Sequence, residues 1–563
     1  MNDEDTNSVL NGLTVRNGWR DSGGGAVNCT EAGMTIKNCR FINCDSQIGN
    51  YAISHYGQRG DRINIENCYF VRSGSVYFSS GNELKISKCV FEDSDLPIDF
   101  QYSYKLDVSD CNFIRYLGGM SGNSAIYVYD ANYVYLNNSS TRKYMGSLYI
   151  CNTDYARITG CDFKYNYGDP IYPAVYSGET QILDINDCDI SYNNSNTSGG
   201  GIYFTGNSYG ILNINNTKIN HNTAYDSGAG IYCVGELNID KSEICFNSVT
   251  GSSSSEGAGI YTGWGDVNIT RSLIKGNKFT NSGTNNKGGG MFCGSGDGSQ
   301  KIENCIITGN SAGYGGAFYG EIATTKFYNC IIAENYAKNS GGGIYFQYGN
   351  YNKITNCTIA NNTANHGGGI YACNTGLDIF NSIASNNRPD NFDDYYTMIG
   401  AYKCVVWPFQ IFSPYSRTTI FVAPQLTVDF HLQAGSPCIS AGDPKYVDDV
   451  NTANKDIDGE NRIYGKVDIG ADEFRDDDKD GLPNFWEEKY FGEPNIADPN
   501  IDSDGDGIIN LTEYIEHGTE PNIAPINYYV SSAQGNDSYD GLSQVWDGMT
   551  SGPKKSVKAA IEL

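Results

Sequence analysis

Two short acidic segments have the residue types and the spacing of calcium-binding loops. Residues 476–487 and 502–513 both follow the pattern D-x-D-x-D-G-x5-E without deviation. Ca²⁺ takes roughly six to eight oxygen ligands, and such a loop supplies carboxylates, a backbone carbonyl and a closing glutamate. We predict that each loop binds one Ca²⁺ through six of its residues: Asp476, Asp478, Asp480, Leu482, Asn484 and Glu487, and Asp502, Asp504, Asp506, Ile508, Asn510 and Glu513.

Short helical stretches are expected at the end of each loop, over residues 482–490 and 508–517. A solvated acidic linker with coincidental spacing is the alternative, but two full matches in succession favour metal binding. The pair resembles the EF-hand-like or thrombospondin-type-3 calcium repeats of bacterial surface proteins. That resemblance implies a structural role, in which calcium stiffens a linker whose carboxylates would otherwise repel one another.

A row of aromatic residues offers a second kind of chemistry, the stacking of flat ligands. Each follows an inward-pointing residue after a glycine-rich segment, so the period-two alternation of a strand turns it outward. The row could stack on sugar rings, or it could only stabilise a parallel sheet through contacts between neighbouring strands. We favour the stabilising role. The candidate ligand-binding residues are Tyr203, Tyr232, Tyr261, Phe292, Tyr319, Tyr345 and Tyr371.

Three charged residues earlier in the chain are the candidates for catalysis. Arg72, Asp93 and Arg115 take the same position in three repeats of the chain. The same stretch contains Glu92, Asp95 and Asp99. Carboxylates and a guanidinium in one groove could cleave a polysaccharide by acid–base chemistry. The alternative, which we favour, is a surface ladder of ion pairs, because such a ladder has the same alternation of charge.

A repeated pattern positions these aromatic and charged residues. From Cys161 to Asn387 a Cys, Ser or Thr is followed by Asn five residues later, nine times at intervals of 25 to 33 residues. Each repeat also holds two strand-like stretches, one before the small residue and one after a glycine cluster. Constant sections with variable insertions are typical of a solenoid. We predict an all-β, single-stranded parallel β-helix of about 14 coils, with turn asparagines stacked amide on amide.

Many of the 18 cysteines fall in the repeated small-residue position. Ser or Thr takes this position in other repeats, and neither could be a disulfide partner. We therefore predict free thiols buried inside the solenoid, where Cys packs as a small apolar residue. Neighbouring coils lie about 5 Å apart, within reach of a disulfide, so pairing of some cysteines is the alternative.

The repeats resemble known families. Glycine clusters followed by Ile-Tyr, together with Phe163-x-x-Asn166, are similar to the repeats of chlamydial polymorphic outer-membrane proteins. More broadly, residues 1–388 resemble bacterial right-handed parallel β-helix proteins of the pectate-lyase-like superfamily. The resemblance implies a right-handed coil and says little about activity. Polysaccharide lyases of that fold use bound Ca²⁺ with Arg or Lys, and its hydrolases use clustered carboxylates.

Three further segments follow the repeats. Residues 389–474, which include residues 430–439 and 467–474, are similar to the choice-of-anchor Q segment of secreted bacterial proteins. We expect this segment to cap the open end of the solenoid, where backbone groups would otherwise lack partners. Residues 475–525 hold the tandem calcium loops. Residues 526–563 resemble the opening of a second pectate-lyase-like β-helix, so we expect the chain to be part of a longer multidomain protein.

Composition and charge narrow the function. A net charge of −27 argues against nucleic acid as a partner, since neutralising phosphates requires excess Lys and Arg. No apolar run is long enough to span a membrane, and the N-terminus lacks a signal peptide, which we expect in a missing upstream part. We predict a monomeric, secreted or cell-surface protein that adheres to or binds a polysaccharide or cell-surface glycan. The alternative is a polysaccharide lyase or hydrolase, and we favour a protein without enzymatic activity.

Overall fold

The computed structural model divides the chain into two compact units, Met1–Pro424 with Pro437–Glu473 and Gln425–Ser436 with Phe474–Leu563. The residues that it describes are 8–57, 60–116, 124–166, 173–251, 254–280, 285–294, 296, 298–322, 324–349, 351–410, 419–447, 455–462, 466–523, 531 and 536. The first unit contains the repeats, and the second contains the acidic loops.

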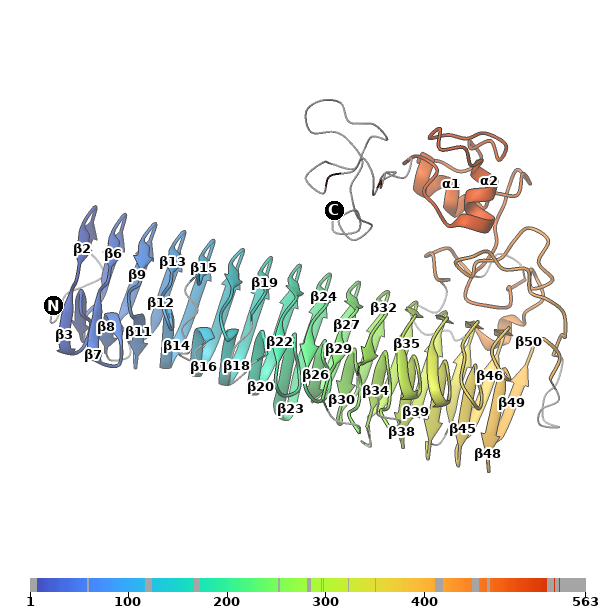
Figure 1. Cartoon of the computed structure of the whole chain (residues 1–563), viewed down its shortest axis with the longest axis horizontal. Helices are drawn as coiled ribbons and strands as arrows, with labels where there is room; N and C mark the ends of the chain where they lie inside the picture. Colours follow the sequence, from blue (N-terminus) through green and yellow to red (C-terminus); the bar gives the residue numbers. More distant parts are fainter. Residues whose placement is uncertain are drawn as a thin grey trace. The chain divides into compact units, whose positions relative to one another are not determined.

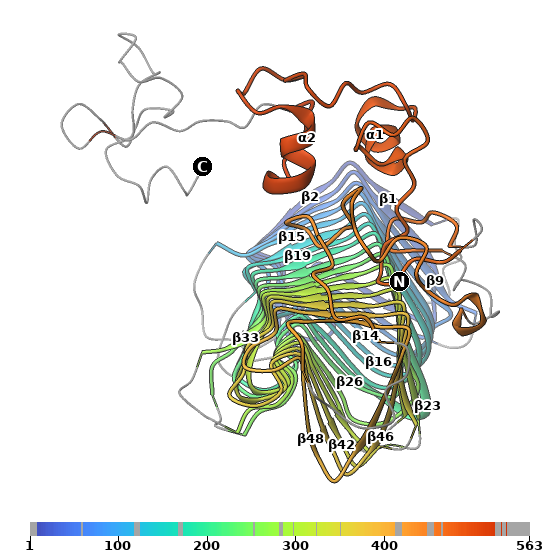
Figure 2. The same ribbon diagram turned by 90° about the vertical axis from the view of Figure 1, so that its right-hand side faces the viewer.

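A single coil of the first unit contains, in order, β26 (Ile231–Val234), β27 (Glu236–Asp240), β28 (Glu243–Cys245) and the short β29 (Ser248–Val249). These strands take successive sides of the cross-section, which Figure 2 shows from the end. Each pairs in parallel with its counterpart in the next coil, so that equivalent positions of the repeat face each other. Ile231 pairs with Ile260, and Ile244 pairs with Ile274. The register therefore places each side chain beside the side chain at the equivalent position of the next coil.

The strands stack into long parallel sheets (Figure 1). Among the described residues, the counterparts of β28 form a 16-stranded sheet from β2 (Thr14–Arg16) to β50 (Val405–Trp407). The counterparts of β26 and β27 belong to a 26-stranded sheet. The predicted all-β parallel solenoid of about 14 turns is thus confirmed. It runs one coil past the boundary expected at residue 388, because β48 (Phe392–Tyr395), β49 (Met398–Tyr402) and β50 pair with the coil before them.

Inward side chains form continuous stacks along the axis, because the alternation of each strand is kept in register. Phe41, Phe70, Phe91 and Phe113 stack with ring centroids 4.5 to 4.9 Å apart. Each such buried apolar side chain contributes about 1.5–3 kcal/mol of transfer free energy. All 18 cysteines are free thiols and most are buried in these stacks, as predicted.

Nine buried asparagines, one in each of nine successive coils, form a hydrogen-bonded ladder: Asn166, Asn193, Asn222, Asn247, Asn277, Asn310, Asn335, Asn362 and Asn387. The Nδ2 of each donates to the Oδ1 of the next at 2.9 to 3.1 Å. This confirms the predicted stacking of amides. The left-handed turn residue lies one position earlier than expected, at Tyr192 and His221 for example. The backbone turns there, and the following asparagine points into the solenoid.

Residues 437–473 lie along the flank of the solenoid, whereas the sequence predicted a cap across its end. Arg462 is fully buried and donates to Asn329 Oδ1 at 2.7 Å. The backbone of the segment also donates to Thr358 Oγ1 and exchanges hydrogen bonds with Asn381. These three partners belong to successive coils, since each lies beside the small residue of its repeat. The polar side chains of three coils therefore attach the segment to the side of the solenoid.

In the second unit, the helical elements are α1 (Asn484–Phe491), α2 (Asn510–Thr512) and a π-helical turn, η2 (Glu513–His517). The two predicted helical stretches begin with α1 and α2, each two residues later than predicted, because Pro483 and Ile509 keep an extended backbone. Leu482, Trp486 and Tyr514 are at the centre of its small apolar core. The second β-helix predicted at 526–563 lies outside the described residues, apart from residues 531 and 536. None of the described helices is long and apolar enough to cross a membrane.

Candidate functional site

The first, third and fifth aspartates of each acidic loop converge. One carboxylate oxygen from each of Asp476, Asp478 and Asp480 lies within 4.8 Å of the others, and Asp502, Asp504 and Asp506 show the same arrangement. The first aspartate closes its loop, since Asp502 Oδ2 accepts a hydrogen bond from the Gly507 N–H at 2.9 Å. Three carboxylates held this close repel one another, and a hard divalent cation bound between them would offset the repulsion. Both triads could therefore bind a metal ion.

The loop at 502–513 also contains buried side-chain oxygens without a hydrogen-bond partner among the described residues. These are Asp504 Oδ2, Asp506 Oδ2, Asn510 Oδ1 and Glu513 Oε2. They come from the third, fifth, ninth and twelfth positions, which supply side-chain ligands in calcium loops. Burial, and then the three aspartates, raise the pKa of Glu513. Since buried oxygens are normally satisfied, these four fit a cation that they would coordinate.

In the loop at 476–487, the side chains at the ninth and twelfth positions already accept hydrogen bonds from the protein backbone. The Glu487 carboxylate accepts backbone hydrogen bonds from Asn495, Ile496 and Ala497 at 2.7 to 2.9 Å. The Asn484 oxygen accepts from a backbone N–H within its own loop at 3.0 Å. Of the side-chain ligands predicted in this loop, only the three aspartates therefore remain available to coordinate a cation. The sequence pattern, which matches both loops equally, did not distinguish them.

The predicted aromatic row is longer than the sequence indicated. We call it the tyrosine ladder, and in the described residues it comprises Tyr127, Tyr149, Tyr176, Tyr203, Tyr232, Tyr261, Phe292, Tyr319, Tyr345 and Tyr371. Neighbouring rings stack nearly parallel, with centroids 4.5 to 5.6 Å apart. Each ring covers the faces of its neighbours, so the ladder offers ring edges to solvent. Stacking of a sugar on the face of a ladder ring would require displacing a neighbour.

At the N-terminal end of the tyrosine ladder, a carboxylate takes the position that an aromatic ring holds in the following coils. Asp99 takes the slot between Tyr77 and Tyr127, and only 6% of the residue is exposed. Its Oδ1 accepts a hydrogen bond from Gln101 Nε2 at 2.8 Å. Burial raises the pKa of Asp99 to about 6. This residue is one of the departures from the repeat that the early coils contain.

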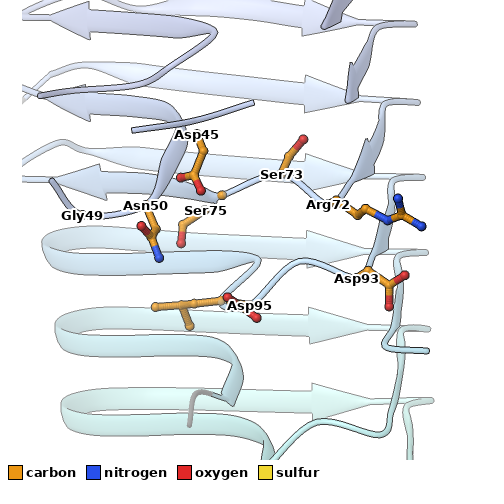
Figure 3. A pocket seen from close by; sticks show the side chains of 10 residues that line it. Asp45, Gly49, Asn50, Arg72, Ser73, Ser75, Asp93 and Asp95 are labelled. Atoms are coloured by element: carbon orange, nitrogen blue, oxygen red, sulfur yellow. The ribbon is translucent and has the colours of Figure 1, made fainter. Parts of the chain in front are cut away.

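The three candidate catalytic residues do not converge on one point. Arg72 and Asp93 line a cavity of about 510 Å³ together with Asp45 and Asp95. In Figure 3 the side chains of Arg72 and Asp93 lie at one end of this cavity, and those of Asp45 and Asp95 lie apart from them. Arg115 is largely buried and pairs with Asp95 at 2.7 Å. Asp93 accepts the Tyr116 N–H at 2.7 Å. The parallel register keeps Arg72, Asp93 and Arg115 at equivalent positions of three successive coils, as the sequence predicted.

A more open pocket, which the sequence did not reveal, lies near the other end of the solenoid. Three turns form it: the turn before β43 (Asn352–Thr355), the turn from β45 (Ile370–Cys373) to β46 (Gly376–Phe380), and the turn from β48 to β49. Figure 2 shows β48 and β46 on the two sides of one corner of the cross-section. The pocket holds about 660 Å³, and the residues that give it its chemistry are Tyr351, Tyr396, Tyr402, Asn374, Thr375 and Asp378. We call it the Tyr351 pocket.

The side chains of this pocket are presented outward. Tyr351 and Tyr396 are 84% and 80% exposed, unlike the buried or partly buried rings of the tyrosine ladder. Both have left-handed backbone (φ of 62° and 51°), a conformation that costs a residue with a Cβ about 1–2 kcal/mol. Glycine at position 400 leaves the floor open beside Asp378, where an added Cβ would stand 2.7 Å from Oδ1. The arrangement combines two exposed rings with one carboxylate and an amide.

Residues 227–401 match the family model described as the right handed beta helix region. This stretch is therefore similar to that family. It includes six rungs of the tyrosine ladder and the residues of the Tyr351 pocket other than Tyr402. The same parallel register continues through the coils on either side, so one β-helix carries both features. No curated protein matched the chain.

Proposed function

We propose that this right-handed β-helix binds neutral carbohydrate at the Tyr351 pocket. The residue types that line this pocket are the observation on which the proposal rests. Tyrosine side chains supply apolar faces with a polar handle, and a carboxylate and an amide accept and donate hydrogen bonds to hydroxyl groups. A chain with a net charge of −27 repels polyanions, so uncharged sugars are the favoured ligands. The tyrosine ladder then stabilises the sheet that carries the pocket.

Each residue has a distinct part in this proposal. Tyr351 and Tyr396 form walls against which a pyranose ring packs. Asp378, whose pKa burial raises, accepts hydrogen bonds from sugar hydroxyls at the floor. Thr375 and Asn352 are linked at 2.8 Å and hold the turn in place. Pre-organised groups of this kind bind with little loss of conformational entropy.

The test measures retention of β-glucan, mannan and xylan, with pectate as the charged control. We expect the native chain to bind a neutral polymer, and Tyr351→Ala with Tyr396→Ala to weaken that binding about tenfold or more, since exposed aromatic anchors dominate such contacts. Asp378→Asn should weaken it less, because an amide keeps one acceptor. The matched control is Tyr209→Ala, at an exposed tyrosine outside the pocket.

Equal retention by native chain and double variant, or no retention of any neutral polymer, would overturn the assignment. A chain that bound pectate and no neutral polymer would contradict the choice of ligand class.

Calcium is the second part of the proposal: Ca²⁺ in the loop at 502–513 stabilises the second compact unit. A ligand that binds only the folded state adds about 2.7 kcal/mol at 100 times its dissociation constant. Calcium should therefore raise the melting temperature and the protease resistance of residues 474–523. Glu513→Gln should remove most of this gain. The control is Glu516→Gln, three residues further on and exposed; equal melting with calcium and with chelator would contradict the site.

We place the protein outside the cell, as an adhesive or glycan-binding surface protein. Extracellular calcium loops function at millimolar affinity, where a loosely built site suffices. Detection of the native protein only in the cytosolic fraction would contradict this location.

A polysaccharide-cleaving site is the second candidate, and the cavity beside Asp45 and Asp95 favours it. Burial, and then the repulsion of Asp95, raises the pKa of Asp45, as a general acid requires. Release of reducing or unsaturated ends from a polymer panel, abolished by Asp45→Asn, would support this activity. The engagement of Asp95 with Arg115 makes it the weaker candidate.

A further inference from the structure

A second pocket of similar chemistry lies at the same corner of the β-helix, near its other end. It holds about 640 Å³, and its characteristic residues are Tyr102, Tyr104, Asp130, Asn132, Ser80 and Asn82. We call it the Tyr102 pocket. Like the Tyr351 pocket, it combines two tyrosines with a carboxylate and an amide. Tyr102 and Tyr104 are 56% and 48% exposed.

The two pockets occupy equivalent positions in the repeat. Phe100 and Asp394 are connected by eleven successive parallel pairings, and Tyr102 and Tyr396 each lie two residues beyond them. Both tyrosines have left-handed backbone at this corner, with φ of 49° and 51°. At about 4.8 Å per coil, eleven steps separate the pockets by about 53 Å along one edge. Figure 1 shows β14 (Ile98–Ser109) and β48 on the same edge of the solenoid.

The intervening coils show that tyrosine at this corner is not a requirement of the fold. The next three coils after Tyr102 have Asp130, Asn152 and Glu179 in the left-handed position. Polar residues thus suffice to make the turn. Tyrosine takes the position in the two pockets and also at Tyr348, which lines neither pocket. In the Tyr102 pocket, hydrogen bonds from Asn152 to Asp130 and from Asn132 to Asp154 fix the polar side chains. T-shaped contacts with Tyr129 and Tyr133 hold the two exposed rings.

We infer that the two pockets bind one chain of a neutral, repeating polysaccharide at the same time. This inference rests on the proposed carbohydrate binding at the Tyr351 pocket. A repeating polymer presents the same sugar to both pockets, and the β-helix holds them at a fixed spacing. The second contact is then intramolecular, which raises the affinity for a long polymer about 10²–10⁴-fold over that for one sugar unit. An oligosaccharide too short to span the gap gains nothing.

The test uses whichever of β-glucan, mannan or xylan the full chain retains, together with its short oligosaccharides. Calorimetry on the native chain should give two oligosaccharide sites and a polymer affinity at least about 100-fold higher. Tyr102→Ala with Tyr104→Ala should leave one oligosaccharide site and reduce the polymer affinity to the oligosaccharide level. Tyr209→Ala should change neither value.

Two results would overturn the inference. If the Tyr102 and Tyr104 double variant binds polymer as tightly as the native chain while the Tyr351 and Tyr396 double variant does not, the carbohydrate site stands and the bivalent arrangement is wrong. If the native chain shows one oligosaccharide site, the Tyr102 pocket is not a binding site. Failure of the native chain to bind any neutral polymer or oligosaccharide would instead remove the proposed function itself.

Discussion

Asn277→Ala is expected to destabilise the β-helix by several kcal/mol. Asn277 is fully buried; its Nδ2 donates to Asn310 Oδ1 at 3.0 Å and to the Ile244 carbonyl at 2.8 Å. Its Oδ1 accepts from the backbone and the side chain of Asn247. Alanine removes these four hydrogen bonds and leaves the Asn247 N–H buried without a partner, which costs about 1–3 kcal/mol. Asn310 Oδ1 keeps the Asn277 N–H, and Asn247 Nδ2 keeps the Ile219 carbonyl, but each loses one of its bonds.

The measurement is the shift of the urea midpoint of the β-helix unit, followed by circular dichroism. The matched control is Asn268→Ala, because Asn268 donates to Asn238 at 3.0 Å in a parallel row of amides that is exposed. Water replaces the lost bond there, so the control should change stability by less than about 0.5 kcal/mol. Equal losses for the two variants would show that the interior ladder has no special role.

The second large effect concerns Asp99, whose burial makes the stability depend on pH. Its pKa is about 6 in the folded chain, against the ordinary value of 3.8. A carboxyl with a raised folded pKa adds stability that is complete below pH 3.8 and is lost as pH rises through 6. At 1.36 kcal/mol per unit, the charged form costs about 3 kcal/mol at pH 8. Asp99→Asn removes this cost, so the variant should be more stable than the native chain at pH 8 and nearly equal to it at pH 4.

The experiment compares urea midpoints of variant and native chain from pH 4 to pH 8. Asp393→Asn is the control, because Asp393 follows Tyr371 in the same register slot and its side chain is 34% exposed. Its difference from the native chain should vary much less with pH. A difference for Asp99→Asn that stayed constant across the range would contradict the burial of a charged group in the ladder.

The repeat made most of the fold predictable, because each coil uses the same local pattern. The Cys/Ser/Thr position and the asparagine five residues later locate two stacks, and parallel register then positions the tyrosines. The difference between the acidic loops was not predictable, since Glu487 is engaged by the backbone of Asn495, Ile496 and Ala497, outside the motif. The flank position of residues 437–473 likewise depends on polar groups contributed by three separate coils.

The pockets were missed for a related reason. Tyr351, Asp378 and Tyr396 are more than 15 residues apart in sequence, and only the register brings them together. One signal was present in the sequence: Tyr396 follows Tyr395 at a turn where another coil has Asn374. Tyrosine at a left-handed position is unfavourable for folding, so its presence indicates a contribution other than stability. The regular aromatic row was the clearest aromatic pattern in the sequence. The exposed rings Tyr102 and Tyr396 lie outside that row, at a left-handed corner of the coil.

The most direct test of the account is a crystal structure of the chain with a short neutral oligosaccharide from the polymer that it retains. The account predicts a sugar ring in the Tyr351 pocket, packed between Tyr351 and Tyr396 with a hydroxyl on the Asp378 carboxylate. Sugar bound along the tyrosine ladder or in the cavity beside Asp45, with the Tyr351 pocket empty, would contradict it.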